Sequence, residues 1–561
     1  MKKIIFLLLI FGGTVYSQKD IPTDYFNNPI EIPLILSGNF GELRNNHFHS
    51  GLDIKTQQRE GIPIYAPADG YLSRIKVSLF GYGKALYLSH PNGYSTVYAH
   101  LQKYAGAIQE HVKEYQYQNE TFTFELFPET NQFLVKKGDL IGYTGNSGSS
   151  GGPHLHFEIR DASSRPMNPM LFGIEISDSI KPIINSVFAY PISEDAQINQ
   201  SQNPVKLRLI LQKDGSYKTE NIKAFGKIGF GISAHDQQNG ASNKNGVYQI
   251  KSTYNGEERF KVLFEKFSFA ETRYLNRYID YPYFKNNRSR VQKLFRQSNN
   301  PLSIIKEESE FGYINIQEEY TSLYTIEVTD FKNNSITISI PIKGEKLEIL
   351  KPREDTKTED FLFSDQANSF TKGKFSVYIP ANSLYENTYL NIKTQGDTLQ
   401  LHKDVTPLHK NMTITVDVSN YKDSDINKLF IGRLNYKGIP YYNTTTRKGD
   451  KLLIYTKVFG SYALVSDNTA PTIKPLNFSD KKWLSKNNTL KIKIEDKLSG
   501  VSSYRATING KFILMEYNYK KDVLTYDFND NIISESENNL KLIVVDNVGN
   551  NATFEATFFR K

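Results

Sequence analysis

Five residues near the N-terminal end of this chain have side chains that could hold a metal ion and move protons beside it. They are His49, Asp53, His100, His154 and His156. Imidazole is the commonest metal ligand in proteins and the usual proton carrier near neutral pH. Seven of the chain's ten histidines lie between His47 and His156, and this clustering favours a shared chemical role.

The spacing of these residues predicts which side chains share a face. His154 and His156 are two positions apart, which places both imidazoles on one side of an extended strand. Pro153 and the glycines before it argue against a helix there. His49 and Asp53 are four positions apart, an even separation that also puts them on one face of an extended segment. A helix would do the same at that spacing, but the neighbouring glycine and asparagines favour the extended form.

The residue types point to hydrolytic metal chemistry. A catalytic zinc ion takes three protein ligands and keeps one position for water. Two histidines and one carboxylate suit a chain that has no cysteine. Two further histidines could then carry protons and stabilise negative charge on oxygen. Each short motif alone occurs often by chance, so the prediction rests on their joint occurrence.

This part of the chain resembles the lysostaphin-type (LytM-like) zinc endopeptidases, which cut the peptides of peptidoglycan. The likeness covers roughly residues 30–172. The segments that carry it, in order and with matching spacing, are 44–54, 63–70, 98–101, 138–148 and 152–158. They contain the signatures His49-Ser-Gly-Leu-Asp53, Tyr98-Ala-His100-Leu and His154-Leu-His156.

The resemblance implies a role for each of the five residues. His49, Asp53 and His156 are the expected ligands of one Zn²⁺ per chain, and His100 and His154 are the expected catalytic pair beside the metal. The implied fold is a compact antiparallel β domain whose groove carries the metal. The implied activity is an exported zinc endopeptidase that cuts peptidoglycan stem peptides or cross-links. The alternative is a catalytically inactive scaffold that regulates other cell-wall hydrolases. Such relatives lack one or more ligands, whereas all five residues are present here.

Three further residues in this region have side chains that could take part in metal or proton chemistry. His47 lies two positions before His49 and could support the metal, although an edge position fits it better. Glu158 could act as a general base by analogy with other zinc peptidases, but we expect it on the strand face opposite His156, in a structural role. We expect His90 to be exposed to solvent.

The composition and the turn signals predict a mainly β protein of several domains. A chain of 561 residues is too long for a single hydrophobic core. Its 36 tyrosines and 35 phenylalanines favour β-strands. The expected divisions are a signal peptide at 1–17, the peptidase-like domain at 18–175 with an insertion at 102–133, an immunoglobulin-like β-sandwich at 176–345, a β-rich module at 346–466, and a second immunoglobulin-like β-sandwich at 467–561.

An internal repeat relates the first and last of these modules. The repeated segments are 177–184 with 466–473, 236–240 with 496–500, and 328–334 with 544–550. The first copy is longer because it contains an elaborated loop at 274–308. We see no chemically reactive group of side chains in the three C-terminal modules.

The N-terminus predicts export. Lys2 and Lys3 precede an apolar run and a small-residue cleavage site before Gln18. The absence of cysteine excludes disulfides and a lipid-anchored cysteine, and no later segment is apolar enough to span a membrane. The formal charge of +8 is scattered, which argues against nucleic-acid binding. We therefore expect a periplasmic, envelope or extracellular protein that is not a lipoprotein and acts on peptidoglycan, with the C-terminal modules as contacts for other envelope proteins.

Overall fold

The computed structural model describes residues 21–354 and 356–561, and the predicted signal peptide at 1–17 lies outside the described residues. The fold is mainly β, as predicted, with an N-terminal domain followed by further β-rich domains. The N-terminal domain corresponds to the expected peptidase-like domain and is referred to as the peptidase domain. Helices are few and short, and α1 (Gly106–Gln118) is among the longer ones. No helix of the described part is long and apolar enough to cross a membrane.

The peptidase domain is built on one antiparallel sheet. Its strands, in spatial order, are β1 (Leu36–Gly38), β2 (Leu52–Lys55), β11 (His154–Arg160), β6 (Ser95–Ala99), β5 (Lys84–Ser89), β4 (Gly70–Val77) and β8 (Phe124–Leu126). A smaller sheet contains β3 (Pro63–Tyr65), β10 (Leu140–Tyr143) and β7 (Lys103–Tyr104). In β11, Leu155, Phe157 and Ile159 are fully buried. This strand therefore lies in the middle of the sheet, and its alternate residues are free to face the site.

The first C-terminal module pairs long strands across a large sheet. Its main strands are β13 (Ile183–Pro191), β18 (Ile222–His235), β25 (Ser335–Gly344), β24 (Thr321–Thr329), β19 (Gln249–Tyr254) and β20 (Glu257–Leu263). The loop at 274–308 contributes two short helices, α2 (Leu275–Tyr278) and α3 (Tyr281–Asn287).

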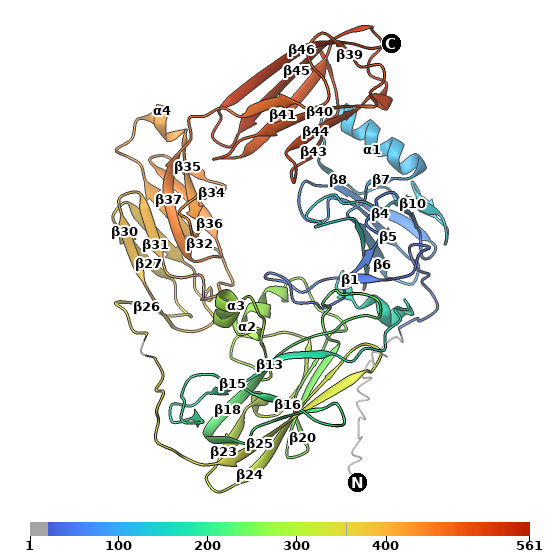
Figure 1. Cartoon of the computed structure of the whole chain (residues 1–561). Coiled ribbons are helices and arrows are strands. Elements are labelled where there is room, and N and C mark those ends of the chain that lie inside the picture. The colour runs from blue at the N-terminus through green and yellow to red at the C-terminus, as the bar shows by residue number, and fades with distance from the viewer. Residues whose placement is uncertain (1–20, 355) are drawn as a thin grey trace, which may run out of the picture.

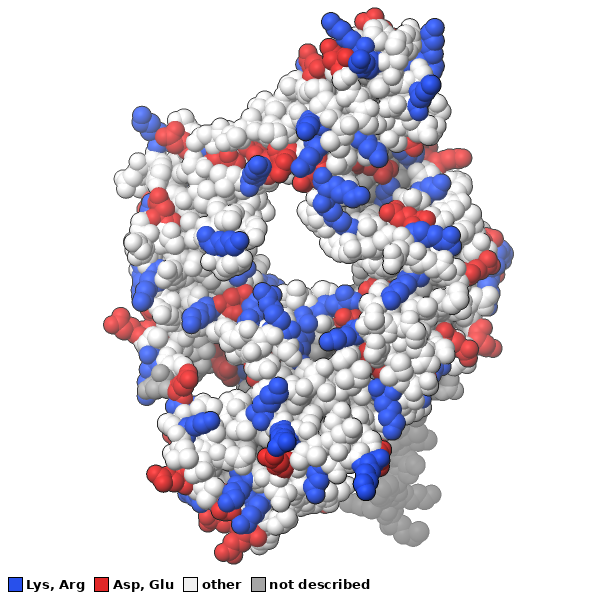
Figure 2. Space-filling model, in the orientation of Figure 1, with Lys and Arg blue, Asp and Glu red and all other residues white. Residues whose placement is uncertain are grey.

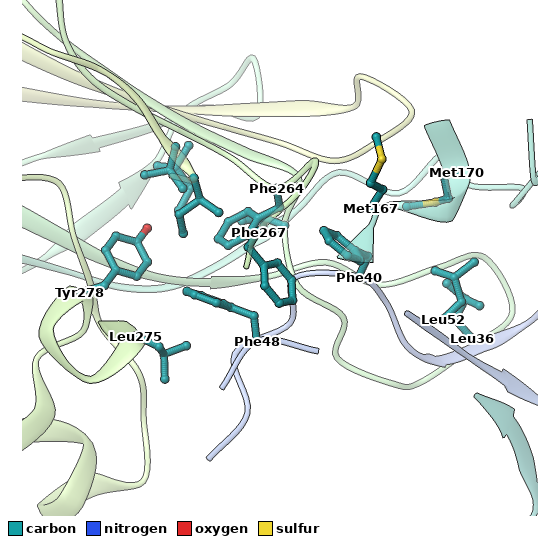
Figure 3. Packing of buried hydrophobic residues seen from close by; sticks show 14 of the residues in the cluster. Leu36, Phe40, Phe48, Leu52, Met167, Met170, Phe264, Phe267, Leu275 and Tyr278 are labelled. Atoms are coloured by element: carbon teal, nitrogen blue, oxygen red, sulfur yellow. The ribbon is translucent and has the colours of Figure 1, made fainter. Parts of the chain in front are cut away.

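This module shares its hydrophobic core with the peptidase domain. Phe40 and Phe48 of the peptidase domain pack against Phe264 and Phe267 of the module, as Figure 3 shows. The ring centroids of Phe40 and Phe267 are 5.1 Å apart, and those of Phe48 and Phe267 are 5.4 Å apart. Full burial of such aromatic side chains is worth about 1.5–3 kcal/mol each, so the two parts stabilise one another.

The two remaining modules each consist of two facing sheets. In the middle module, one sheet consists of β27 (Asn368–Lys372), β28 (Phe375–Ile379), β32 (Met412–Asp417), β36 (Lys451–Thr456) and β35 (Thr446–Lys448). The other sheet consists of β30 (Ile392–Gln395), β31 (Thr398–Leu401), β37 (Gly460–Ser466), β33 (Leu429–Leu434) and β34 (Pro440–Tyr442). In the last module the strands are β38 (Thr472–Pro475), β40 (Thr489–Glu495), β44 (Val523–Asp527) and β43 (Glu516–Asn518), opposite β39 (Lys482–Trp483), β46 (Asn551–Phe559), β45 (Glu537–Asp546), β41 (Val501–Ile508) and β42 (Lys511–Phe512). Each module has its own hydrophobic core.

The four parts close into a ring (Figure 1) with an opening through its middle (Figure 2). Several contacts between the last module and the peptidase domain close the ring, and one group of them involves α1, which lies within the predicted insertion at 102–133. Lys113 Nζ lies 3.0 Å from Asp530 Oδ1, and the Tyr117 hydroxyl donates to Asp530 Oδ2 at 2.6 Å. Glu120 pairs with Arg505 at 2.7 Å. The insertion therefore docks the last module.

Reversing one charge in this contact should open the ring. Asp530→Lys would place a lysine against Lys113 and remove the acceptor of Tyr117, so we expect a larger radius of gyration in small-angle X-ray scattering. The double variant Asp530→Lys with Lys113→Asp should restore the compact value. Glu555→Lys, an exposed position on the same module, serves as the matched control. An unchanged radius of gyration in a folded Asp530→Lys protein would show that the ring does not depend on this contact.

Candidate active site

Strand register brings the predicted residues together. β11 lies between β2 and β6, and His156 is directly opposite Asp53 on one side and Ala99 on the other. His100 follows β6 in a left-handed backbone conformation, with φ of 63°. This conformation is uncommon for a residue with a side chain and ends the strand in a sharp turn. The pairing of neighbouring strands therefore explains why residues 53, 100 and 156 meet.

Three of the predicted residues form a tight triangle of ligand atoms. His49 Nε2 lies 3.0 Å from Asp53 Oδ1 and 3.1 Å from His156 Nδ1, and His156 Nδ1 lies 2.8 Å from Asp53 Oδ1. In a tetrahedral site with bonds of about 2.0–2.1 Å, neighbouring ligand atoms are separated by about 3.3 Å. The triangle is thus close to the size that one small ion requires.

The two histidines of the triangle are held so that each aims a lone pair at its centre. His49 Nδ1 lies 2.7 Å from the carbonyl oxygen of Asn39, and His156 Nε2 lies 2.8 Å from Glu158 Oε1. A carbonyl or carboxylate oxygen only accepts, so each of these ring nitrogens is the one that donates. His49 Nε2 and His156 Nδ1 are then unprotonated in the neutral rings, which is the state a metal ligand needs.

His100 and His154 lie beside the triangle and are oriented in the same way. His100 Nδ1 is 2.9 Å from the carbonyl oxygen of Ser147. His154 Nδ1 is 2.8 Å from the carbonyl oxygen of Gly152, and its Nε2 lies 3.4 Å from Asp53 Oδ1. The two ring centroids are 4.7 Å apart. Both imidazoles therefore present Nε2 to the same small space.

The donor set fits a cation rather than a hydrogen-bond network. His49 Nε2 and His156 Nδ1 face one another at 3.1 Å, and in the neutral tautomers described above neither nitrogen carries a proton. The ionised carboxylate of Asp53 offers only acceptor atoms to both of them. Three lone pairs that converge in a buried place repel one another unless a positive charge lies between them. These three residues could hold a metal ion.

The electrostatics of the site match this arrangement. Burial acts to raise the pKa of the Asp53 carboxyl, but His49 and the other two neighbouring imidazoles hold that pKa well below its usual range. Burial acts to lower the pKa of His156, yet Asp53 and Glu158 raise it to about 9, so without a metal this ring holds a second proton at Nδ1, which a bound cation would replace. Burial, together with His156 and His154, lowers the pKa of His100 to about 3. The His100 ring is therefore uncharged at neutral pH, with Nε2 as its lone-pair nitrogen.

The expectation that Glu158 faces away from His156 is wrong. The two residues are two positions apart on β11, so they share a face, and the strand period alone would have placed Glu158 in the site. Its carboxylate is fully buried between His156 Nε2 at 2.8 Å and Arg160 Nε at 2.6 Å. Against the effect of burial, Arg160 and His156 hold the pKa of Glu158 far below its usual range. Glu158 therefore fixes the His156 ring, and its carboxylate is fully buried.

Tyr82 and Arg44 belong to the site although the sequence analysis passed over them. The Tyr82 ring stacks on His156 with centroids 5.3 Å apart, and its hydroxyl donates to Glu158. Arg44 Nη2 donates to Asp53 Oδ2 at 3.0 Å, so the oxygen that does not face the triangle is also bound. The segment 44–54 contains the arginine, but nothing in the spacing indicated Tyr82.

The other histidines near the cluster lie outside the site. His47 is exposed, and its Nδ1 lies 2.8 Å from the carbonyl oxygen of Asn45. His90 was expected to be exposed, and this was wrong, because its ring is buried between the carbonyl oxygen of Asp69 and the hydroxyl of Thr96, each at 2.9 Å. His90 is a structural residue of the sheet.

The glycine-rich loop at 145–152 forms one wall beside His100. Gly148 has φ of 65°, and a side chain there would come within 2.4 Å of the Gly81 carbonyl oxygen, so only glycine permits this close approach. The last module contacts the same loop, with Lys520 Nζ 2.7 Å from the carbonyl oxygen of Asn146 and the Tyr519 hydroxyl 3.4 Å from that of Gly148. The wall is thus held between a neighbouring turn and a distant module.

Comparison with known proteins agrees with the predicted fold of this domain. Residues 47–117 and 129–169 match peptidase family M23, and residues 359–467 match the Zu5-like domain. The interval between the two M23 segments falls inside the predicted insertion at 102–133. The chain therefore carries an M23 peptidase domain of the lysostaphin (LytM-like) type.

Curated relatives share this domain and little else. The chain is 31% identical over 156 residues to the DD-carboxypeptidase/endopeptidase Mpg of Neisseria meningitidis serogroup B, an alignment that covers 28% of this chain and 27% of the relative. It is 29% identical to the peptidoglycan DD-endopeptidase ShyB of Vibrio cholerae, over 28% of this chain and 31% of the relative. The chain thus spans less than a third of the length of these relatives.

Solved structures match over the same part of the chain. A zinc-containing peptidase from Vibrio cholerae is 27% identical over 26% of this chain and 39% of its own, with a TM-score of 0.20. The catalytic domain of lysostaphin from Staphylococcus simulans is 24% identical over 24% of this chain and 90% of its own, with a TM-score of 0.19.

The hydrogen bond from His156 to Glu158 should be needed for tight metal binding. Glu158→Gln keeps the size of the side chain but removes the negative charge between His156 and Arg160. Loss of one partner of a buried ion pair costs about 3–5 kcal/mol, so folding of the variant is checked first by circular dichroism. We expect zinc affinity to fall about 10- to 100-fold, because outer partners of metal-binding histidines contribute that much. Competition with a chromophoric chelator measures the affinity.

Glu125→Gln is the matched control, because this glutamate forms partly exposed ion pairs with Arg74 and Lys76 on the same sheet. Its zinc affinity should equal that of the wild type. Equal affinities for all three proteins would mean that Glu158 does not support the ligand.

Proposed function

We propose that this protein is an exported, zinc-dependent endopeptidase that hydrolyses peptide bonds in the stem peptides or cross-links of peptidoglycan. The observation that carries the proposal is the convergence of ligand atoms from His49, Asp53 and His156, with two further imidazoles, His100 and His154, beside them. Three protein ligands leave one position for water, which is the arrangement of catalytic rather than structural zinc.

Each residue of the site has a task that its contacts support. His49, Asp53 and His156 would hold the zinc ion. When bound, zinc supplies Lewis-acid chemistry, namely polarisation of the scissile carbonyl and a nucleophilic water at neutral pH. His100 accepts the proton of the attacking water at Nε2, because its Nδ1 already donates to the carbonyl oxygen of Ser147 and Nε2 is the nitrogen left with a lone pair. His154 lies on the other side of the same space and, once protonated, stabilises the negative charge that develops on the carbonyl oxygen.

The choice of peptidoglycan as the substrate rests on the relatives. Mpg is named a DD-carboxypeptidase/endopeptidase, and ShyB is named a peptidoglycan DD-endopeptidase. A substrate in the cell envelope agrees with the export signal predicted at 1–17. The residues of the site do not select among the bonds of the stem peptide.

The three C-terminal modules, at 176–345, 346–466 and 467–561, would hold the enzyme at the envelope or contact partner proteins there. The Zu5-like match at 359–467 and the ring contact through Asp530 support a role in positioning the peptidase domain rather than in its chemistry.

Digestion of purified peptidoglycan by the full chain tests this function. Zinc-loaded wild type should release peptide fragments that mass spectrometry identifies. His100→Ala should bind one zinc ion per chain and lose hydrolysis by about 100-fold or more, because it removes the proton acceptor and leaves the ligands in place. Metal content is measured on the same samples.

His111→Ala is the matched control, since this histidine lies on α1 and packs against Phe133, outside the site. It should cut as fast as the wild type. A zinc-loaded His100→Ala protein with full activity would refute the role of His100. A zinc-loaded wild type without activity would favour the alternative, an inactive scaffold that regulates other hydrolases.

A further inference from the structure

The internal repeat brings three aspartates together in the first C-terminal module. Asp178, Asp236 and Asp330 each belong to a different repeated segment, and each offers a carboxylate oxygen that lies within 4.8 Å of the other two. We expected no reactive group of side chains in this module, and this cluster is one that could hold a metal ion. The repeat was visible in the sequence, but the convergence of its three segments needs the folded strands.

Two buried oxygen atoms at this cluster have no hydrogen-bond partner among the described residues. They are Oδ1 of Asp236 and Oδ1 of Asn245, and the two residues are only 6% and 4% exposed. Both residues line a small cavity of about 30 Å³, together with Asp178 and Asp330. An unpaired buried oxygen costs about 1–3 kcal/mol, and more if it is charged, so two of them at one cavity indicate a missing positive partner.

We propose that Asp178, Asp236, Asp330 and Asn245 bind a calcium ion in this cavity. Carboxylate and amide oxygens are the ligands that calcium takes, at about 2.3–2.6 Å, so oxygens on opposite sides of the ion are separated by at most about 5 Å. Magnesium usually keeps several of its waters, and a cavity of about 30 Å³ leaves little room for them. The absence of sulfur and imidazole from the set argues against zinc.

The surrounding charges agree with a cation in this position. Burial, with the charges of Asp178 and Asp330, raises the pKa of the Asp236 carboxyl to about 7. The three carboxylates therefore repel one another, and a divalent cation between them removes that repulsion. Lys332 also lines the cavity, and its backbone amide donates to the Asp330 carboxyl, but no ion pair joins its side-chain ammonium to the three aspartates among the interactions of the described residues.

The proposed site lies where the first module meets the peptidase domain. Gln238 accepts from Leu36 N at 2.8 Å and donates to the carbonyl oxygen of Leu34 at 2.9 Å. Asn39 exchanges two hydrogen bonds of 2.7 Å with the backbone of Gly246. The loop between Asp236 and Gly246 thus holds the segment 34–39.

That segment reaches the active site, because the carbonyl oxygen of Asn39 accepts from His49 Nδ1. Asp236 and Asn245 pair through both backbone amides, at 2.9 and 2.8 Å, so a calcium ion bound by both would fix the whole loop. We infer that calcium locks the first module against the backbone that orients His49.

The last module contains the three equivalent aspartates, but its cluster has no buried oxygen without a hydrogen-bond partner among the described residues. Asp467, Asp496 and Asp546 also lie within 4.8 Å of one another. None of their oxygens is among the buried atoms of the described residues that lack a hydrogen-bond partner. The proposal is therefore confined to the first module, and the second cluster provides a matched comparison.

Equilibrium dialysis of the zinc-loaded full chain against radioactive calcium tests the proposal. The wild type should bind calcium saturably, and Asp236→Asn should bind one ion fewer per chain. Calcium should raise the Tm of the wild type more than an equal concentration of magnesium does, because it binds the folded state. In calcium-free buffer the Tm of Asp236→Asn should equal or exceed that of the wild type, since one of three repelling charges is gone.

Asp496→Asn is the matched control and should bind as much calcium as the wild type. Asp178→Asn provides a second variant of the site and should lose the same single ion. Zinc content and far-ultraviolet circular dichroism identify any variant that fails to fold. The proposal is overturned if the wild type binds no calcium at millimolar concentration, or if folded Asp236→Asn and Asp178→Asn bind as much as the wild type.

Discussion

The active site depends on one constraint: each of its four imidazoles donates a hydrogen bond from one ring nitrogen to a fixed acceptor. The other ring nitrogen is thereby directed towards the centre of the site. Three of the acceptors are backbone carbonyl oxygens, of Asn39, Ser147 and Gly152, and the fourth is the Glu158 carboxylate. Backbone acceptors cannot change rotamer, so the orientation of the rings is a property of the fold. The site is prepared for a metal before any metal binds.

The rest of the structure holds those acceptors in place. Asn39 lies on a segment that the first module binds through Gly246, and aromatic side chains of both parts form one core behind it. Ser147 lies on a loop that the last module contacts through Tyr519 and Lys520. Because the ring is closed through Asp530, both supports belong to one continuous framework. The C-terminal modules thus support the orientation of His49 and His100 through the backbone.

Much of the site could be predicted from the sequence, because strand parity is a local property. The even spacing of His154 and His156 placed them on one face, and the family resemblance supplied the division into ligands and catalysts. The same rule, that residues two positions apart on a strand share a face, also places Glu158 beside His156. The expectation that Glu158 lies on the opposite face misapplied this rule. Tyr82 could not be predicted, because it enters the site from a turn that carries no spacing signal. The mainly β fold was predicted correctly, whereas ring closure and the aspartate cluster depend on contacts between segments far apart in the sequence.

X-ray absorption at the zinc edge tests the central claim most directly, because it counts the ligands of the bound ion. For the zinc-loaded wild type the account predicts two imidazole nitrogens and two oxygens, one from Asp53 and one from water, at about 2.0–2.1 Å. His100→Ala should leave this spectrum unchanged, since His100 is not a ligand. A zinc ion surrounded by three or four imidazoles would contradict the account, because His100 or His154 would then be bound to the metal and could not carry a proton.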